Sequence, residues 1–244
     1  MRNNRYIVTG GTRGIGRAIV NRLIEDNNDV MFTWLESESE SNDIIELGSQ
    51  KGLVVEAFQC DLTDLNQTAH LASELTQRGP YDGLINCATG RVKLELIENS
   101  SIEQWKESLS INLLSPLILC KELMGSLRKG SSIINFSSPN VQICQEGTAA
   151  YSASKAALEI FSKILAREAG VLGIRVNTVR PGPTLTDGML AIAEGPEEIE
   201  QLTLATPLGG IAKPEQIADA VIALCNHDNR WVSGDCLNVS GGLF

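Results

Sequence analysis

The sequence contains few of the residues with which proteins most often bind metal ions. Its 244 residues include two histidines and six cysteines, and no two cysteines form a CxxC pair. Because structural zinc sites depend on closely spaced thiol and imidazole ligands, we expect no metal site. Four of the cysteines lie in apolar stretches, and we interpret these as reduced core residues. The six are Cys60, Cys87, Cys120, Cys144, Cys225 and Cys236.

Long apolar runs and an excess of positive charge are also absent. No run approaches the roughly 20 apolar residues that a membrane-spanning helix needs, and the N-terminus does not have the pattern of a signal peptide. Lys and Arg number 20 against 30 Asp and Glu, which gives a net charge of −10. Nucleic-acid backbones and anionic membranes are therefore not expected as main partners. We expect a cytoplasmic globular protein.

What the sequence does contain is a regular alternation of strand-like and helix-like segments. Short apolar runs of the kind buried on both faces of a sheet occur at 5–9, 29–34, 53–60, 83–86, 132–136, 175–179 and 236–239. Helical spacing of apolar residues occurs at 17–27, 65–78, 102–127 and 150–169. This order predicts an α/β fold, a Rossmann-type doubly wound parallel sheet of about seven strands with helices on both faces.

The chain shows no sign of a second domain. It has no repeat, no low-complexity linker and no break in composition, so we predict one domain over residues 1–244. The acidic stretch 36–40 is interpreted as a solvated loop or the start of a helix. Residues 181–214 are rich in proline and contain one short helical piece at 197–204. Such a long segment between ordered elements is typical of a lid, which we place at 183–213.

A glycine-rich turn follows the first strand and opens the first helix. It has the sequence TGGTRGIG and extends from Thr9 to Gly16. Glycines allow the backbone to turn tightly and approach a pyrophosphate, and the following helix N-terminus offers free N–H groups. The alternative is a glycine-rich turn that binds nothing.

Two further motifs follow the fifth predicted strand. Tyr151 and Lys155 are four residues apart at the start of a helix and share one face. An ammonium group near a phenol favours the phenolate, so we expect a lowered pKa for Tyr151, and such a group can exchange a proton with a ketone. Ser138 ends the strand before them, where a hydroxyl can hold a carbonyl oxygen. Taken alone, each motif is also compatible with a surface pair or a polar strand end.

Together these motifs resemble the short-chain dehydrogenase/reductase family over essentially the whole chain. The resemblance implies that Ser138, Tyr151 and Lys155 are catalytic and that Asn112 holds a water of the proton relay. It also implies hydride transfer between a nicotinamide and a carbonyl carbon, with Lys155 holding the nicotinamide ribose. The implied cofactor-binding residues are Gly10, Thr12, Arg13, Gly14, Ile15, Gly16, Trp34, Asp61, Leu62, Asn86, Ala88, Tyr151, Lys155, Pro181, Gly182, Thr184 and Thr186.

Four positions depart from the family pattern. The usual NNAG after the fourth strand is Asn-Cys-Ala-Thr here, so that Cys87 replaces Asn and Thr89 replaces Gly. We expect altered packing or affinity there, and not a loss of cofactor binding. Near the end of the lid, Gly210 replaces an Arg and Ala212 replaces a Gly. In relatives that Arg helps to hold the lid and the subunit contacts, so we expect both to differ here.

The residues at the end of the second strand favour NADP over NAD. Trp34 occupies the position where relatives that prefer NAD carry an Asp, so no carboxylate competes with a 2′-phosphate. Arg13 can pair with that phosphate. Against this, Leu35 occupies a position that is basic in many NADP-dependent relatives, and Glu36 follows it directly.

The closest resemblance is to 3-oxoacyl-[acyl-carrier-protein] reductases of fatty-acid and polyketide pathways. It implies an acidic acyl carrier protein as partner, for which Arg128 and Lys129 are candidate docking cations, unless they only end a helix. Leu172 occupies a second position at which those reductases usually carry a docking Arg, although Arg167 and Arg175 are near it in the sequence. A lid with Leu185, Met189, Leu190, Ile192, Leu202 and Leu204 favours an apolar acyl chain.

Two alternatives remain open from the sequence. The protein could act on a free small ketone, sugar or secondary metabolite, or it could be a nucleotide-binding partner subunit without turnover. The resemblance also implies a homo-oligomer, most commonly a tetramer, that packs through the two long helices and the last strand.

Overall fold

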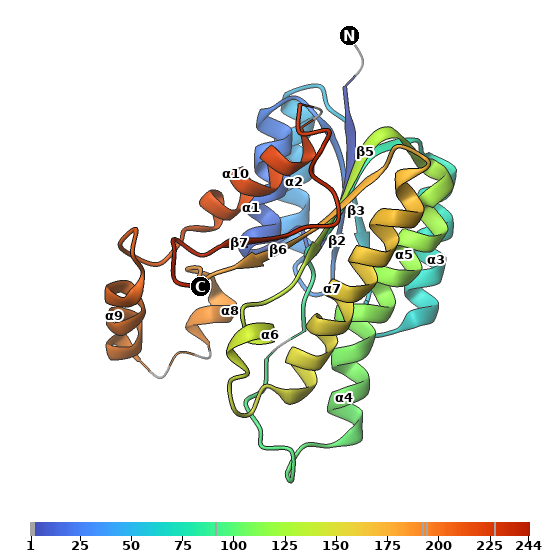
Figure 1. The fold of residues 1–244 in the computed structure, drawn as a ribbon. Helices are drawn as coiled ribbons and strands as arrows, with labels where there is room; N and C mark the ends of the chain where they lie inside the picture. Colours follow the sequence, from blue (N-terminus) through green and yellow to red (C-terminus); the bar gives the residue numbers. More distant parts are fainter. Residues whose placement is uncertain (1–2, 91, 192, 194, 227) are drawn as a thin grey trace.

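One parallel sheet contains all seven strands that we predicted (Figure 1). The structure, a computed structural model, describes residues 3–90, 92–191, 193, 195–226 and 228–244. The strand order is β3-β2-β1-β4-β5-β6-β7, and every neighbouring pair is parallel. The order reverses between β1 and β4, and this reversal opens a crevice at the carboxyl ends of the strands. The strands are β1 (Arg5–Thr9), β2 (Asp29–Trp34), β3 (Val55–Gln59), β4 (Tyr81–Asn86), β5 (Leu127–Phe136), β6 (Arg175–Pro181) and β7 (Cys236–Val239).

Helices cover both faces of the sheet, as the sequence predicts (Figure 1). On one face lie α1 (Gly14–Glu25), α2 (Glu38–Gln50) and α10 (Pro214–Cys225), which enclose an apolar cluster around Val8, Phe32 and Ile134. On the other face lie α3 (Leu65–Arg78), α5 (Ser115–Leu123) and α7 (Ala149–Gly170), which enclose a second cluster around Ile7, Leu84 and Ile133. The α4 helix (Ile102–Leu109) extends beyond the sheet beside α7. The shorter helices are α6 (Asn140–Ile143), α8 (Asp187–Leu190) and α9 (Pro196–Ala205).

The predicted helix 102–127 is wrong as a single element. The segment begins as α4, continues through a π-helical turn at Ser110–Leu114 and α5, and ends in a 3₁₀ turn at Met124–Ser126. Leu127 then starts β5 by pairing with Tyr81, five residues earlier than the predicted strand. The prediction joined the helix to the strand because α5 and β5 contribute buried apolar side chains to the same cluster, so the apolar pattern continues from one to the other.

Of the longer helices, α10 was not predicted, and α2 was predicted only as the helix start that was left open for the acidic stretch 36–40. The α2 helix begins inside the acidic stretch, at Glu38, and buries only Ser41, Ile44 and Gly48. The α10 helix starts with Pro214 and buries Ile217 and Val221 against α1. Its proline at the first helical position and its apolar i, i+4 spacing were signals for a helix that could have been recognised. No helix among the described residues is both long and apolar enough to cross a membrane.

Candidate functional site

The glycine-rich turn is held against β2 and cannot accept larger residues at its key positions. Gly10 N donates to Thr33 Oγ1 and Gly11 N to Thr33 O, each over 2.9 Å. Gly10 has a φ of +70°. A Cβ on Gly16 would lie 2.1 Å from the carbonyl oxygen of Gly10. The α1 helix therefore begins directly beneath the turn, as pyrophosphate binding requires.

The first turn of α1 presents its amide groups to the crevice. Arg13 occupies the N-cap, and its exposed side chain makes no capping hydrogen bond to the described helix. Thr12 is buried, and Gly14 has a φ of +55°. A Cβ on Gly14 would lie 3.3 Å from Thr186 Cγ2. The turn and the segment after β6 thus form two sides of one narrow cradle, and a dinucleotide pyrophosphate fits its N–H donors and positive helix end.

The segment after β6 is anchored from both sides. Gly182 N donates to Val239 O over 2.8 Å, and a Cβ on Gly182 would lie 2.7 Å from Ser240 Cα. Thr184 forms a parallel bridge with Ala212. Thr186 accepts a hydrogen bond from Met189 N and caps α8. The Gly-to-Ala departure at position 212 therefore leaves the base of the predicted lid connected. Ile192, part of the predicted apolar lid, lies outside the described residues.

The adenine side of the crevice is formed by the ends of β2 and β3. Trp34 is partly buried at the end of β2, and its carbonyl accepts from Cys60 N. Asp61 Oδ1 accepts from Thr63 N and Thr63 Oγ1 over 2.9 and 2.7 Å. Leu62 is buried beside it. These three predicted cofactor residues therefore lie at the carboxyl ends of adjacent strands, on one edge of the sheet.

Asn86 ends β4 and Ala88 follows it, and both brace the middle of the crevice. Asn86 Nδ2 donates to Asn135 Oδ1 over 2.8 Å, and Ala88 N donates to Thr9 Oγ1 over 3.0 Å. Cys87 N shares the Thr9 acceptor. The Asn-to-Cys departure therefore keeps the backbone contacts of this turn.

The predicted Ser–Tyr–Lys group is brought together by β5 and α7. Ser138 is buried just beyond the end of β5, and its Oγ accepts from Asn140 N over 3.2 Å. Lys155 is buried and donates from Nζ to the carbonyl oxygen of Phe136 over 2.7 Å. The same Nζ lies 5.7 Å from the centre of the half-buried Tyr151 ring. A carbonyl placed at this edge can meet a hydroxyl, a phenol and an ammonium group together.

The pKa shifts of this group follow from its burial. Burial raises the pKa of the Tyr151 phenol, and hydrogen bonding with Ser138 and Thr89 offsets only part of the rise. Burial also lowers the pKa of Lys155 to about 8, with Cys87 acting in the opposite direction. The sequence-based expectation of a lowered pKa for Tyr151 is therefore wrong, because desolvation of the phenol outweighs the hydrogen bonds that lower its pKa.

Asn112 lies in the π-helical turn and is buried. Its side chain accepts from Thr89 Oγ1 over 3.1 Å and donates to Ser154 Oγ over 3.1 Å and Ser108 Oγ over 3.3 Å. Single π-helical turns inside α-helices are frequent at functional sites. Thr89 and Ser154 are site neighbours that the sequence did not predict, although the departure from glycine at position 89 was a signal.

A hollow lies behind Tyr151, on the α4 side. Its polar lining includes Lys93, Glu95, Gln104, Ser108 and Asn112. No group of three or more potential metal ligands occurs in the described part of the chain.

Two of the candidate docking cations are engaged within the chain. Arg128 lies in β5 and not at a helix end, and it pairs with the buried Asp82 over 2.7 Å. Arg175 is buried and donates to the carbonyl oxygen of Leu224 over 2.7 Å. The expected docking patch is therefore smaller than the sequence indicated, because strand β5 starts earlier than predicted and β6 turns Arg175 inward.

A doubly wound parallel sheet, with a glycine-rich cradle after β1 and a Ser–Tyr–Lys group at the same edge, defines the class of Rossmann-type oxidoreductases. A sequence profile described as Enoyl-(Acyl carrier protein) reductase matches residues 10–244. An acetoacetyl-CoA reductase of Allochromatium vinosum is 32% identical over 98% of this chain and 97% of its own. An uncharacterised oxidoreductase of Methylorubrum extorquens is 33% identical, over 97% of this chain and 96% of its own.

The solved structures agree with this class. A blue fluorescent protein from a metagenomic library, in complex with NADPH, superimposes with a TM-score of 0.91. It is 32% identical and covers 98% of this chain and 97% of its own. The protein belongs to the short-chain dehydrogenase/reductase family and is an oxidoreductase.

Proposed function

We propose that the protein reduces a ketone to a secondary alcohol with NADPH, and that its substrate is a 3-oxoacyl thioester. The observation that carries the proposal is the meeting of Ser138, Tyr151 and Lys155 beside the anchored segment after β6. A nicotinamide bound there supplies the hydride. All other steps of the reaction depend on side chains of this chain.

Each side chain has a role that follows from its position. Ser138 Oγ orients the carbonyl oxygen, and Tyr151 donates the proton to it. Lys155, held by Phe136 O, binds the ribose hydroxyls and stabilises the phenolate left on Tyr151. Asn112 holds a relay water on the side of the hollow behind Tyr151. Because burial raises the pKa of Tyr151, its hydroxyl is protonated at neutral pH, as reduction requires.

We infer NADPH as the cofactor because Arg13 is exposed at the cradle and Trp34 leaves no carboxylate at the end of β2. Arg13→Ala is expected to raise the Kd for NADPH about tenfold or more, the loss of one charge-assisted contact to a phosphate. The Kd for NADH, which has no 2′-phosphate, is expected to stay within about twofold. Fluorescence titration measures both, and an equal loss for the two cofactors would contradict the inference.

The lowered pKa of Lys155 predicts the pH dependence of the reaction. With a pKa of about 8, the side chain is mostly protonated at pH 7 and mostly neutral at pH 9. The kcat/KM for NADPH, which reports on the free enzyme, is expected to fall as pH rises through about 8. The arginine of Lys155→Arg stays charged over this whole pH range, so the residual kcat/KM of the variant is expected not to fall as the pH rises through about 8. A wild-type profile that stays flat between about pH 7 and 9.5 would exclude the assigned role.

Apolar side chains on the segment after β6 support a substrate with an acyl chain. We propose that residues 183–213 form a lid over the substrate, within one domain that comprises the whole chain. Leu185, Leu190 and Leu204 are exposed on this segment and can cover an acyl chain. The similarity to an acetoacetyl-CoA reductase supports a thioester. Carrier-protein docking has less support, because Arg128 and Arg175 make contacts within the chain.

The test is NADPH consumption with acetoacetyl thioesters, both CoA-linked and carrier-bound, with NADH for comparison. Turnover with both thioesters supports the proposal, and a strong preference for the carrier-bound form would add the carrier protein as a partner. Turnover of free ketones alone would refute the thioester substrate. NADPH binding without turnover of any carbonyl would refute the ketoreductase and indicate a non-catalytic subunit.

We also propose that the protein forms a homo-oligomer. The family resemblance favours a tetramer. Ile160 and Ile164 are exposed on the outer face of α7 by 58% and 53%. Exposed apolar side chains in sequence along one helix are typical of subunit interfaces. Light scattering after size-exclusion chromatography measures the state directly.

A further inference from the structure

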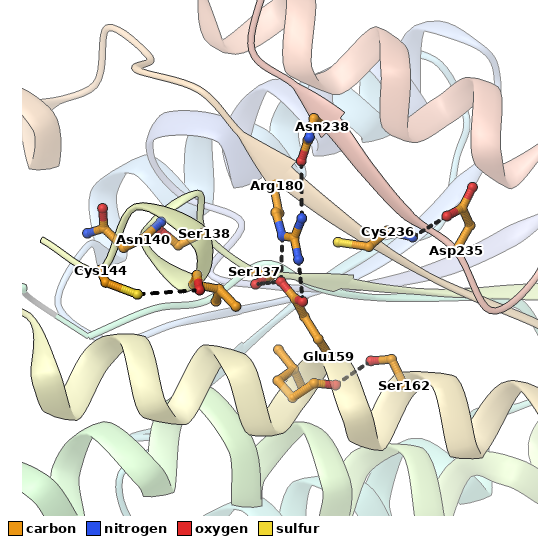
Figure 2. Close-up of polar contacts among 12 residues, drawn as sticks. Ser137, Ser138, Asn140, Cys144, Glu159, Ser162, Arg180, Asp235, Cys236 and Asn238 are labelled. Atoms are coloured by element: carbon orange, nitrogen blue, oxygen red, sulfur yellow. Dashed lines mark hydrogen bonds and ion pairs between the residues drawn. The ribbon is translucent and has the colours of Figure 1, made fainter. Parts of the chain in front are cut away.

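The α7 helix carries a buried carboxylate one turn after Lys155. Glu159 is 5% exposed. Arg180 of β6 contacts it twice, with Nε on Oε1 over 2.6 Å and Nη2 on Oε2 over 2.5 Å. Ser137 Oγ donates to Oε1 over 2.5 Å. Figure 2 shows the three side chains converging between the sheet and the helix.

Each partner of this carboxylate adjoins a part of the proposed site. Ser137 directly precedes Ser138, and Arg180 directly precedes the segment that starts with Pro181 and Gly182. Glu159 and Lys155 are one turn apart on the same face of α7. Since Lys155 Nζ binds Phe136 O, α7 holds two successive residues at the end of β5. The contact extends to β7, where Asn238 Oδ1 accepts from Arg180 Nη1 over 3.5 Å.

The pair is not needed to keep the strands adjacent. Ser137 N already donates to Val179 O, and Gly182 N to Val239 O, each over 2.8 Å. A buried ion pair contributes little net stability, because desolvation of both charges opposes their attraction. What the two-point contact does provide is a defined orientation of α7 over β5 and β6.

The charges of the pair are maintained by their mutual contacts. Burial by itself would raise the pKa of Glu159, but hydrogen bonds from Arg180 and Ser137 outweigh it and hold the pKa below its ordinary value. The hydrogen bond to Glu159 raises the pKa of Arg180. Cys236 of β7 also faces the carboxylate, and burial together with Glu159 raises the pKa of its thiol, so it remains neutral.

We propose that Glu159 and Arg180 are positioning residues, which hold helix α7, the end of β5 and the segment after β6 in the geometry of the reaction. The proposal rests on the proposed function, because it takes Ser138, Tyr151 and Lys155 as the reacting group. Small displacements between such groups cost rate more than they cost binding.

The test compares two matched carboxylate-to-amide variants. Glu159→Gln breaks the pair near the site. Asp82→Asn breaks a similar pair at the other end of the sheet, where Asp82 is 4% exposed and accepts from Arg128 over 2.7 Å. For Glu159→Gln we expect kcat to fall about tenfold, with the KM for the carbonyl within about twofold. For Asp82→Asn we expect a lower Tm with kcat within about twofold of wild type.

A second variant and a spectroscopic readout keep the test decisive. Arg180→Lys keeps the charge but loses the two-point contact, so we expect a loss of kcat in the same direction. The emission spectrum of bound NADPH reports the surroundings of the nicotinamide, and we expect it to change in Glu159→Gln and not in Asp82→Asn. Equal losses of kcat in the two variants, or a Glu159→Gln protein with wild-type kcat and emission, would overturn the proposal. If the wild-type protein turned over no carbonyl compound, the proposed function would be refuted, and not the positioning role. The emission spectra of bound NADPH would still test the role of the Glu159–Arg180 pair.

Discussion

Tyr151→Phe is expected to reduce carbonyl turnover by about 1,000-fold, within the range that a positioned general acid contributes. The phenylalanine ring keeps the shape of the half-buried side chain and its packing near Lys155 Nζ, which lies 5.7 Å from the ring centre. Only the hydroxyl that hydrogen-bonds with Ser138 and Thr89 is lost. NADPH binding is therefore expected to change by less than about threefold, or about 0.7 kcal/mol. Steady-state kinetics and fluorescence titration measure the two effects separately.

Tyr81→Phe is the matched control for this prediction. Tyr81 is fully buried at the start of β4, and its hydroxyl donates to the carbonyl oxygen of Leu75 over 2.7 Å. Its loss is expected to cost about 1 kcal/mol of stability and to leave kcat unchanged. If Tyr151→Phe retained more than about a tenth of wild-type turnover, Tyr151 would not be the proton donor, because general acids contribute at least about 100-fold.

Gly16→Ala is expected to abolish useful NADPH binding. The added methyl group would lie 2.1 Å from the carbonyl oxygen of Gly10, a backbone atom that cannot move without displacing the turn. Moving the turn takes the first amides of α1 away from the pyrophosphate. Each charge-assisted hydrogen bond to the pyrophosphate is worth about 1.5–3 kcal/mol, so the loss of one or two is expected to raise the Kd for NADPH about a hundredfold. Isothermal titration calorimetry gives the value.

Gly125→Ala provides the control for an added methyl group. Gly125 lies in the 3₁₀ turn before β5, and nothing lies within 4 Å of the position that its Cβ would occupy. Its NADPH affinity is expected to equal that of wild type. Circular dichroism shows whether Gly16→Ala is folded, and a folded variant with wild-type affinity would show that the turn does not bind the cofactor.

The sequence determined the features that depend on local chemistry. The glycine-rich turn is readable because glycine adopts the positive φ values of Gly10 and Gly14 most readily, and because the close contact at Gly16 leaves no room for a Cβ. The bounds of β1, β2, β7 and α3 agree with the prediction because turn residues or a capping Asp64 mark their ends. The order of these elements then restricts the topology to a doubly wound sheet, and with it the edge at which Ser138, Tyr151 and Lys155 meet.

Tertiary structure alone decided what depends on distant neighbours. The direction of the Tyr151 pKa follows from how completely the fold desolvates the phenol, which the spacing of Tyr151 and Lys155 does not reveal. Glu159 and Arg180 are 21 residues apart and became partners only when α7 crossed the ends of β5 and β6. Arg175 appeared as an available cation in the sequence, yet the fold turns it inward to the end of α10. In each case the charge is local, but its energy is set by the dielectric and the partners that packing brings to it.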